Sequence, residues 1–165
     1  GGYYLLTESV FLKKEDVASG TSSITNEHFT NQNAMVYKFN TESKLAWEYE
    51  VKRDEQRSVN DGAKANRVWG GVLSNDQLIL VYRDAWARHD GIKRDVITYP
   101  VSAWTGYVFE TLTTEGKLQK TILIKDQKIA GPSGSYLMIP QTGTVIGNSI
   151  YMTGFRNKSL VSLLI

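Results

Sequence analysis

The feature that most constrains the fold is a repeat within the chain. The stretch GGVLSNDQLILVYRDAW (residues 70–86) resembles GTVIGNSIYMTGFRN (residues 143–157) at an offset of 73 residues. At the same offset, FNTESKLAWEYEVK (39–52) aligns with LTTEGKLQKTILIK (112–125). The two blocks share nine identical positions, where average composition predicts about two. Two blocks that agree on one offset indicate a duplicated structural unit.

Each copy contains the elements of a four-stranded antiparallel unit. A strand is followed by a T-E-S-K-L (41–45) or T-E-G-K-L (114–118) turn, a second strand, a variable segment, a third strand, an Asn-containing turn and a fourth strand. The units span about 34–84 and 107–157, and the opening GGYYLLTES has the form of one more fourth strand. Four antiparallel strands make one blade of a β-propeller, and such a unit needs stacked neighbours to bury its faces. We therefore predict a single all-β domain or fragment of about two blades plus part of a third. A β-sandwich with internal duplication is the alternative.

Turn signals separate short apolar or alternating segments along the chain. In 45–52, Trp47, Tyr49 and Val51 share one side and acidic or basic residues share the other, as in a half-buried strand. The strands predicted in this way are 3–11, 35–40, 45–52, 68–73, 77–82, 95–99, 107–113, 117–124, 136–139, 144–146, 149–155 and 159–164. The best helical candidate, 84–89, is too short to be stable alone.

Two polar stretches interrupt this rhythm, and a third is strongly charged. Residues 13–33 are rich in Ser, Thr, Asn and Glu, and 54–66 are charged and end in DGAKAN. Both are predicted to be long loops, which in compact domains are usually functional or disordered. The third is RDAWARHDGIKRD (83–95), which has no counterpart in the second copy.

Composition excludes several classes of function. The 165 residues suit one domain, and 19 basic against 17 acidic residues give a net charge of +2, too balanced for a nucleic-acid surface. The chain has no cysteine, so disulfides and thiolate metal sites are excluded. No apolar run approaches the roughly 20 residues of a membrane-spanning helix. The opening GGYYLLTE reads as the middle of a hairpin rather than a signal peptide, so we expect a piece of a longer protein.

Five segments of the chain resemble propeller-type repeats of Bacteroidetes envelope and secreted proteins. They are GGYYLLTES, AMVYKFNTESKLAWEYEV, VLSNDQLILVYRD, VFETLTTEGKLQKT and the closing YMTGFRNKSLVSLLI. Glu8, Trp47, Asn75 and Asp84 stand at the characteristic places. Ser43 replaces the glycine usual in the first turn, whereas the second copy has Gly116. The resemblance implies a cell-surface, periplasmic or secreted location and a scaffold or binding role. It brings no catalytic residues.

The charged segment around Trp86 is the candidate ligand-binding site. An aromatic ring can stack on a sugar while charged groups bind hydroxyls, and an Arg beside an aromatic also suits a protein hot spot. The alternative is a solvated connector whose Trp covers the core. The candidate residues are Arg83, Asp84, Trp86, Arg88, His89 and Asp90.

Catalysis and metal binding are less favoured. Asp84, Asp90 and Asp95 could supply the carboxylate pair of a glycosidase, but no serine-nucleophile, phosphate-loop or dinucleotide pattern occurs. His28 and His89 lack a third metal ligand. We therefore expect no catalytic residue, cofactor or metal.

The favoured function is non-enzymatic. The chain is expected to be an extracytoplasmic scaffold that binds another protein, or the remaining blades of its parent protein, through loops 13–33, 54–66 and 83–95. The alternative is a carbohydrate-binding or glycan-processing domain that uses Trp86 with Arg83, Asp84 and Asp90. No nucleic acid and no membrane span are expected.

Overall fold

The computed structural model describes residues 1–19, 22–53, 56–59, 67–85, 105–125, 137–156 and 159–164. Within these ranges the regular structure is strand throughout, which confirms the prediction of an all-β fold built of antiparallel sheets. The strands are β1 (Tyr3–Ser19), β2 (Ser22–Phe39), β3 (Leu45–Val51), β4 (Gln56–Val59), β5 (Trp69–Val72), β6 (Leu78–Ala85), β7 (Thr105–Leu112), β8 (Leu118–Lys125), β9 (Leu137–Ile146), β10 (Ser149–Arg156) and β11 (Ser159–Leu164).

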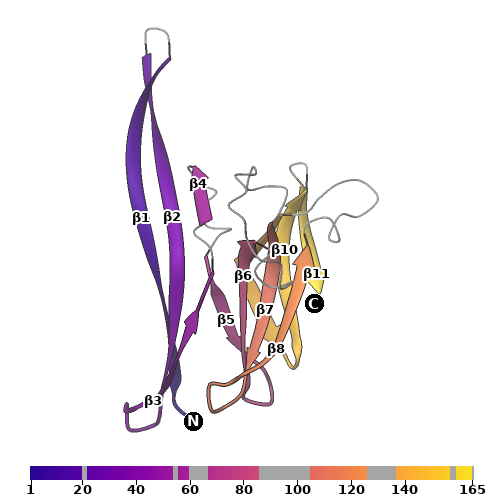
Figure 1. Ribbon diagram of the computed structural model, residues 1–165. Helices are drawn as coiled ribbons and strands as arrows, with labels where there is room; N and C mark the ends of the chain where they lie inside the picture. The colour runs from indigo at the N-terminus through magenta and orange to yellow at the C-terminus, as the bar shows by residue number, and fades with distance from the viewer. Residues whose placement is uncertain are drawn as a thin grey trace.

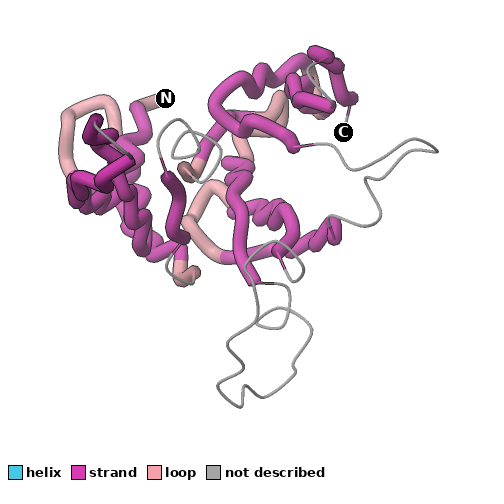
Figure 2. The backbone as a smooth tube through the Cα atoms, turned by 90° about the horizontal axis from the view of Figure 1, so that it is seen from above, coloured by secondary structure: helices cyan, strands magenta, loops and turns pink. Residues whose placement is uncertain are grey.

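The strands form three antiparallel sheets (Figure 1). The first sheet has the order β1-β2-β3, with β4 also paired to β2. The central sheet has the order β5-β6-β7-β8, and the third sheet has the order β9-β10-β11. Seen from above, the first and third sheets lie on opposite sides of the central sheet (Figure 2).

The 73-residue repeat is visible in the backbone of two turns. The N–H of Asn40 donates to the carbonyl of the fourth residue after it (3.0 Å), and the N–H of Thr113 does the same (2.8 Å). Ser43 (φ 59°) and Gly116 (φ 79°) occupy the left-handed region at equivalent positions. The side chains of Asn40 and Thr113 also accept hydrogen bonds from the same two backbone positions in each turn. The two T-E-x-K-L turns therefore share one geometry, and its backbone form recurs in the β5–β6 turn, where the N–H of Leu73 donates to the carbonyl of Gln77 (2.8 Å) and Asp76 has a φ of 61°.

The sheets, however, do not coincide with the predicted repeat units. Unit 34–84 contributes its first two strands to the first sheet and its last two, β5 and β6, to the central sheet. The central sheet is completed by β7 and β8 from unit 107–157. The expectation that one unit forms one blade is corrected accordingly: the central sheet joins the end of the first unit to the start of the second. The tight turns hold strand neighbours together, whereas the variable segment after β3 leads to another sheet.

The ungapped alignment of the two copies is also corrected at one turn. Val72 pairs with Leu78 across the β5–β6 turn, whereas Val145 pairs with Ile150 across β9–β10, a connection one residue shorter. Because a one-residue slip moves a side chain to the other face of a sheet, residues beyond these turns align with an offset of 72. The identity of Arg83 with Arg156 is therefore not a structural equivalence.

The core consists of two layers, one on each face of the central sheet. Leu80, Tyr82 and Val108 pack toward the first sheet, and Val81 and Phe109 pack toward the third. This alternation is what period-2 strands produce when both faces are covered. All five side chains are at most 3% exposed.

The polar stretch 13–33, predicted to be a loop, is instead the extension of a hairpin. Beyond an irregularity at Glu8/Val10, β1 and β2 continue to pair from Val10/Asn31 to Ser19/Ser22, and we call residues 10–19 and 22–31 the arm (Figure 1). The arm has no apolar alternation to reveal it, because it covers no core. Cross-strand polar pairs hold it instead, such as the Lys14–Glu27 ion pair (3.0 Å). Of the other predicted loop, 54–66, residues 56–59 form β4 and the rest lie outside the described residues.

The longer connections leave from one end of the sheets, together with the two-residue connection between β10 and β11. These longer connections are the arm and the segments that follow β3, β6 and β8 (Figure 1). The tight turns 40–44, 73–77, 113–117 and 147–148 lie at the opposite end.

Candidate functional site

Only two of the predicted site residues belong to the described part of the chain. Arg83 and Asp84 are the two residues before Ala85, the last residue of β6. The start of the helical candidate 84–89 is therefore strand. Trp86, Arg88, His89 and Asp90 lie outside the described residues, as does Asp95.

The structure does not bring Arg83 and Asp84 together. Consecutive residues of a strand point to opposite faces. Asp84 is fully buried on the face toward the first sheet, where its charge acts on Arg53. The guanidinium of Arg83 lies over the ring of Tyr107, 5.4 Å from its centroid, as in a cation–π contact. A buried Asp84 is not placed to bind a sugar hydroxyl or to serve as an accessible acid.

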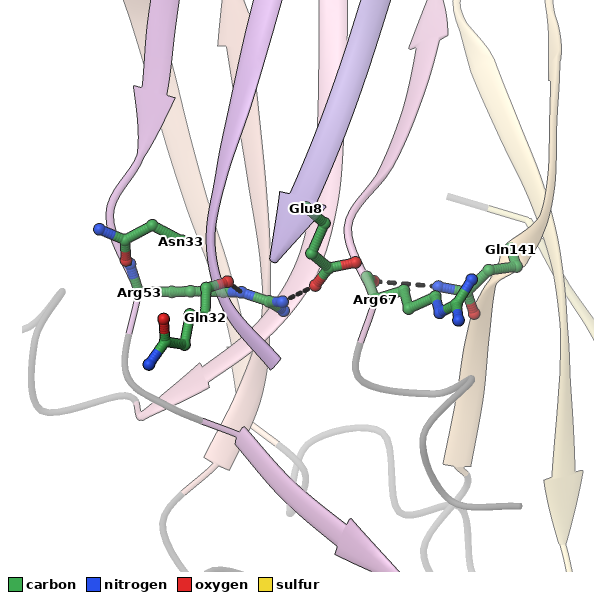
Figure 3. A network of polar contacts seen from close by, with 6 residues as sticks. All are labelled: Glu8, Gln32, Asn33, Arg53, Arg67 and Gln141. Carbon is green, nitrogen blue, oxygen red and sulfur yellow. Dashed lines mark hydrogen bonds and ion pairs between the residues drawn. The ribbon is translucent and has the colours of Figure 1, made fainter. Parts of the chain in front are cut away.

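A buried polar network lies instead between the first and central sheets (Figure 3). Arg53 follows β3, and its side chain is entirely buried. It forms an ion pair with the Glu8 carboxylate from β1, and its Nε donates to the backbone carbonyl of Gln32 (2.9 Å). The backbone N–H of Arg53 donates to the side chain of Asn33 (3.3 Å). These contacts fasten the root of the arm to the end of β3.

Burial sets the electrostatics of Arg53. Desolvation lowers the pKa of its guanidinium to about 10, while the nearby charge of Asp84 opposes the shift. The side chain therefore stays charged at neutral pH and balances buried carboxylates on two sheets. A buried charge of this kind is tolerated only when it is paired and hydrogen-bonded.

A second buried carboxylate, Glu110 on β7, is held by tyrosines. The hydroxyl of Tyr49 on β3 donates to Glu110 Oε2 (3.0 Å). Burial raises the pKa of both Tyr49 and Tyr82, and the charge and hydrogen bonding of Glu110 raise them further. Both phenols therefore remain protonated donors, and the cluster joins β3 of the first sheet to β6 and β7 of the central sheet.

These partners give the buried network a structural role. Its acids face Arg or Tyr groups rather than solvent. Among the residues that the structure describes, no group of three or more His, Asp and Glu could hold a metal ion. His28, predicted to lie in a loop, is on β2 in the arm, where its Nε2 lies 3.3 Å from the carboxylate of Glu15. In the described ranges, no helix is long and apolar enough to cross a membrane.

Comparison with known proteins gives no assignment. No family model, curated protein or solved structure matches this chain.

Sequence reasoning singled out neither Arg53 nor Glu110. Arg53 directly follows an alternating strand and reads as the start of a polar loop, and Glu110 reads as a solvent-facing strand residue. The alternation of 107–112 does place Glu110 on the same side as Val108 and Leu112, which are both buried. That parity was the only signal in the sequence.

Proposed function

We propose that this chain is an extracytoplasmic, β-propeller-like scaffold that binds another protein through the segments at one end of its sheets. The observation that carries the proposal is that the arm and the three longer connections, which follow β3, β6 and β8, all leave from one end of the sheets. Rigid sheets that present long connections at one end are a common arrangement for binding. The extracytoplasmic location rests on the resemblance of GGYYLLTES and the later segments to Bacteroidetes envelope repeats.

The outer face of the first sheet supports a propeller-like continuation. Tyr3 and Leu5 on β1 are 50% and 47% exposed. Leu78 and Leu80 hold the same positions relative to the following strand in the central sheet, and they are 3% and 0% exposed. Since the preceding sheet covers the leucines, a further sheet of the same kind would cover Tyr3 and Leu5. The remaining blades of a parent protein are the proposed source of that sheet.

Exposed apolar side chains on the arm favour a protein partner over a glycan. Phe11, Leu12, Val17 and Ile24 are between 43% and 59% exposed. Aromatic and aliphatic groups at a protruding site are typical anchors of protein interfaces. The carbohydrate alternative loses support, because Asp84 is buried and Arg83 points to the other face of the sheet.

A pull-down from a Bacteroidetes envelope fraction tests the proposal. The wild-type chain is compared with an arm variant, Phe11→Ser with Leu12→Ser, and with a control at the opposite end, Glu42→Lys with Lys44→Glu. We expect one protein to bind both the wild-type chain and the control variant. The same protein should not bind the arm variant or Trp86→Ala. Retention by every variant would contradict the proposal. Glycan binding on an array that Trp86→Ala abolishes would favour the carbohydrate alternative.

A further inference from the structure

The outer edge of β1 in the arm carries an unusual order of residues. Within the described strands, β1 pairs only with β2, so its other edge presents unpaired backbone groups (Figure 1). Every residue from Phe11 to Ala18 is exposed. Such an edge invites pairing with another strand, and natural proteins commonly guard it with charges that repel a second copy. The order Phe-Leu-Lys-Lys-Glu-Asp-Val along 11–17 does not repel in this way.

One face of this edge is complementary to itself. Phe11, Lys13, Glu15 and Val17 share a face because they alternate along the strand. In an antiparallel pair of two β1 strands centred on Lys14, Phe11 lies opposite Val17 of the second copy. Lys13 then lies opposite Glu15 of the second copy, and the twofold axis repeats both contacts. Apolar pairs and opposite-charge pairs across strands each stabilise a sheet.

We infer that a second copy of this chain pairs with the outer edge of β1, forming an antiparallel homodimer centred on Lys14. The other face of the strand is less complementary, because Leu12 lies opposite Asp16 of the second copy, so the register rests on the Phe11–Val17 and Lys13–Glu15 pairs of the first face. Lys14 meets its own counterpart at the axis, but each Lys14 is already paired with Glu27 on β2 and lies diagonally across from Asp16 of the second copy. Val10 lies opposite Ala18 there. The net charge of segment 13–16 is zero, so the two β1 segments that face each other across the axis bring no net repulsion.

The geometry closes at two copies. A twofold axis uses the same edge on both chains. The other edge of the arm is the outer edge of β2, which already pairs with β4 over His28–Asn31. The pairing therefore gives a dimer and not a fibre. It goes beyond the proposed function but uses the same arm, because Phe11 and Val17, offered there to another protein, contact the second copy here. The charge variants at Lys13 and Glu15 leave both apolar side chains in place, so loss of the dimer and loss of another partner are measured by different variants.

Charge reversal with complementation tests the pairing. The masses of the wild-type chain, Lys13→Glu, Glu15→Lys and an equimolar mixture of the two variants are measured by sedimentation over a wide concentration range. We expect a wild-type dimer, and a dissociation constant raised at least about tenfold in each variant alone. The mixture restores dimerisation because the heterodimer recovers both ion pairs. Lys44→Glu, at the turn end, is the matched control and leaves the dimer unchanged.

The absence of cysteine allows a direct test of the register. Opposed residues in an antiparallel pair have Cα atoms about 4.5 to 5.5 Å apart, which suits a disulfide. Under mild oxidation Lys14→Cys is expected to cross-link two copies, whereas Lys13→Cys alone and the remote Glu42→Cys cross-link slowly. A mixture of Lys13→Cys and Glu15→Cys cross-links efficiently. Four results would each overturn the inference. The wild-type chain could be monomeric throughout, the charge variants could dimerise unchanged, or their mixture could fail to recover the dimer. The fourth is that Lys14→Cys cross-links no faster than Glu42→Cys. Circular dichroism of each variant establishes that it is folded.

Discussion

The indole N–H of Trp47 donates a hydrogen bond to the backbone carbonyl of Thr114, 2.8 Å away. Trp47 lies on β3 of the first sheet, and Thr114 lies in the β7–β8 turn of the central sheet. A Cβ on Gly116 of the same turn would come 2.5 Å from the indole ring, so the ring rests directly on the glycine. This contact ties two sheets together at the turn end. Lys120 stands at the position equivalent to Trp47 in the second copy, so the contact is specific to this interface.

Trp47→Phe is expected to lower the free energy of unfolding by about 1–2 kcal/mol, because one net hydrogen bond and part of the ring contact are lost. Urea unfolding measures the change. Thr114→Ser keeps the backbone carbonyl and the hydroxyl, so it should unfold close to the wild type. Equal stability of Trp47→Phe and wild type would show that the contact contributes nothing.

Gly116→Ala should destabilise the chain by roughly 2–3 kcal/mol. Two causes act together: the residue has a φ of 79°, and the new methyl group would meet the Trp47 ring. The double variant Gly116→Ala with Trp47→Ala separates them. When Trp47 is already alanine, Gly116→Ala should lower the free energy of unfolding by less than it does in the wild type, since only the backbone strain remains. If the loss is the same in both backgrounds, a clash with the Trp47 ring is excluded.

Ser43→Gly is expected to stabilise the chain by up to about 1 kcal/mol. Ser43 occupies the left-handed position that Gly116 fills in the second copy. Its φ of 59° is unfavourable for serine and costless for glycine. Thermal unfolding of Ser43→Gly and Ser43→Ala provides the comparison. A loss of stability on Ser43→Gly would mean that the serine side chain contributes more than its backbone costs.

Removing Arg53 should be among the most damaging single changes. Arg53→Met leaves the largely buried Glu8 carboxylate without its cation and removes the positive charge that acts on the buried Asp84, and a broken buried pair typically costs about 3–5 kcal/mol. Lys52→Met, one residue earlier and exposed, should stay within about 0.5 kcal/mol of wild type. Arg53→Met with Glu8→Leu should recover part of the loss. Chemical denaturation of the three variants tests this, and a mild effect of Arg53→Met alone would contradict the role of the network.

Alkaline pH is expected to destabilise the fold through Tyr49 and Tyr82. Their pKa values are raised in the folded state, so their contribution is fully present below the ordinary tyrosine pKa near 10. As pH rises above 10 the unfolded chain loses protons that the folded chain keeps, and stability falls. The lowered pKa of Arg53 acts in the opposite sense over the same range. Tyr49→Phe should flatten the fall in stability, whereas Tyr3→Phe should not, as unfolding at several alkaline pH values would reveal.

The sequence predicts the strands and turns well because their signals are local. The alternation around Trp47 and the left-handed turn positions at Ser43 and Gly116 are properties of a few adjacent residues. Sheet membership is not local, since the sequence does not say that β6 pairs with β7 across the segment 86–104. The arm was missed because polar cross-strand pairs, and not burial, hold it together. The predicted strand ended at Tyr82, whereas β6 continues to Ala85. The prediction therefore did not show that the side chains of Arg83 and Asp84 point to opposite faces of the sheet.

The central claim is that the central sheet joins the end of one repeat unit to the start of the next, and amide hydrogen exchange across the β6–β7 pair tests it most directly. Strands β6 and β7 are paired on both edges and buried on both faces of the central sheet. The amides of Leu80–Tyr82 and Tyr107–Phe109 are therefore predicted to exchange most slowly, at rates set by global unfolding. If each unit folded as its own sheet, β6 and β7 would be edge strands. Alternate amides in both would then exchange as fast as those on the outer edge of β1, and that result would contradict the account.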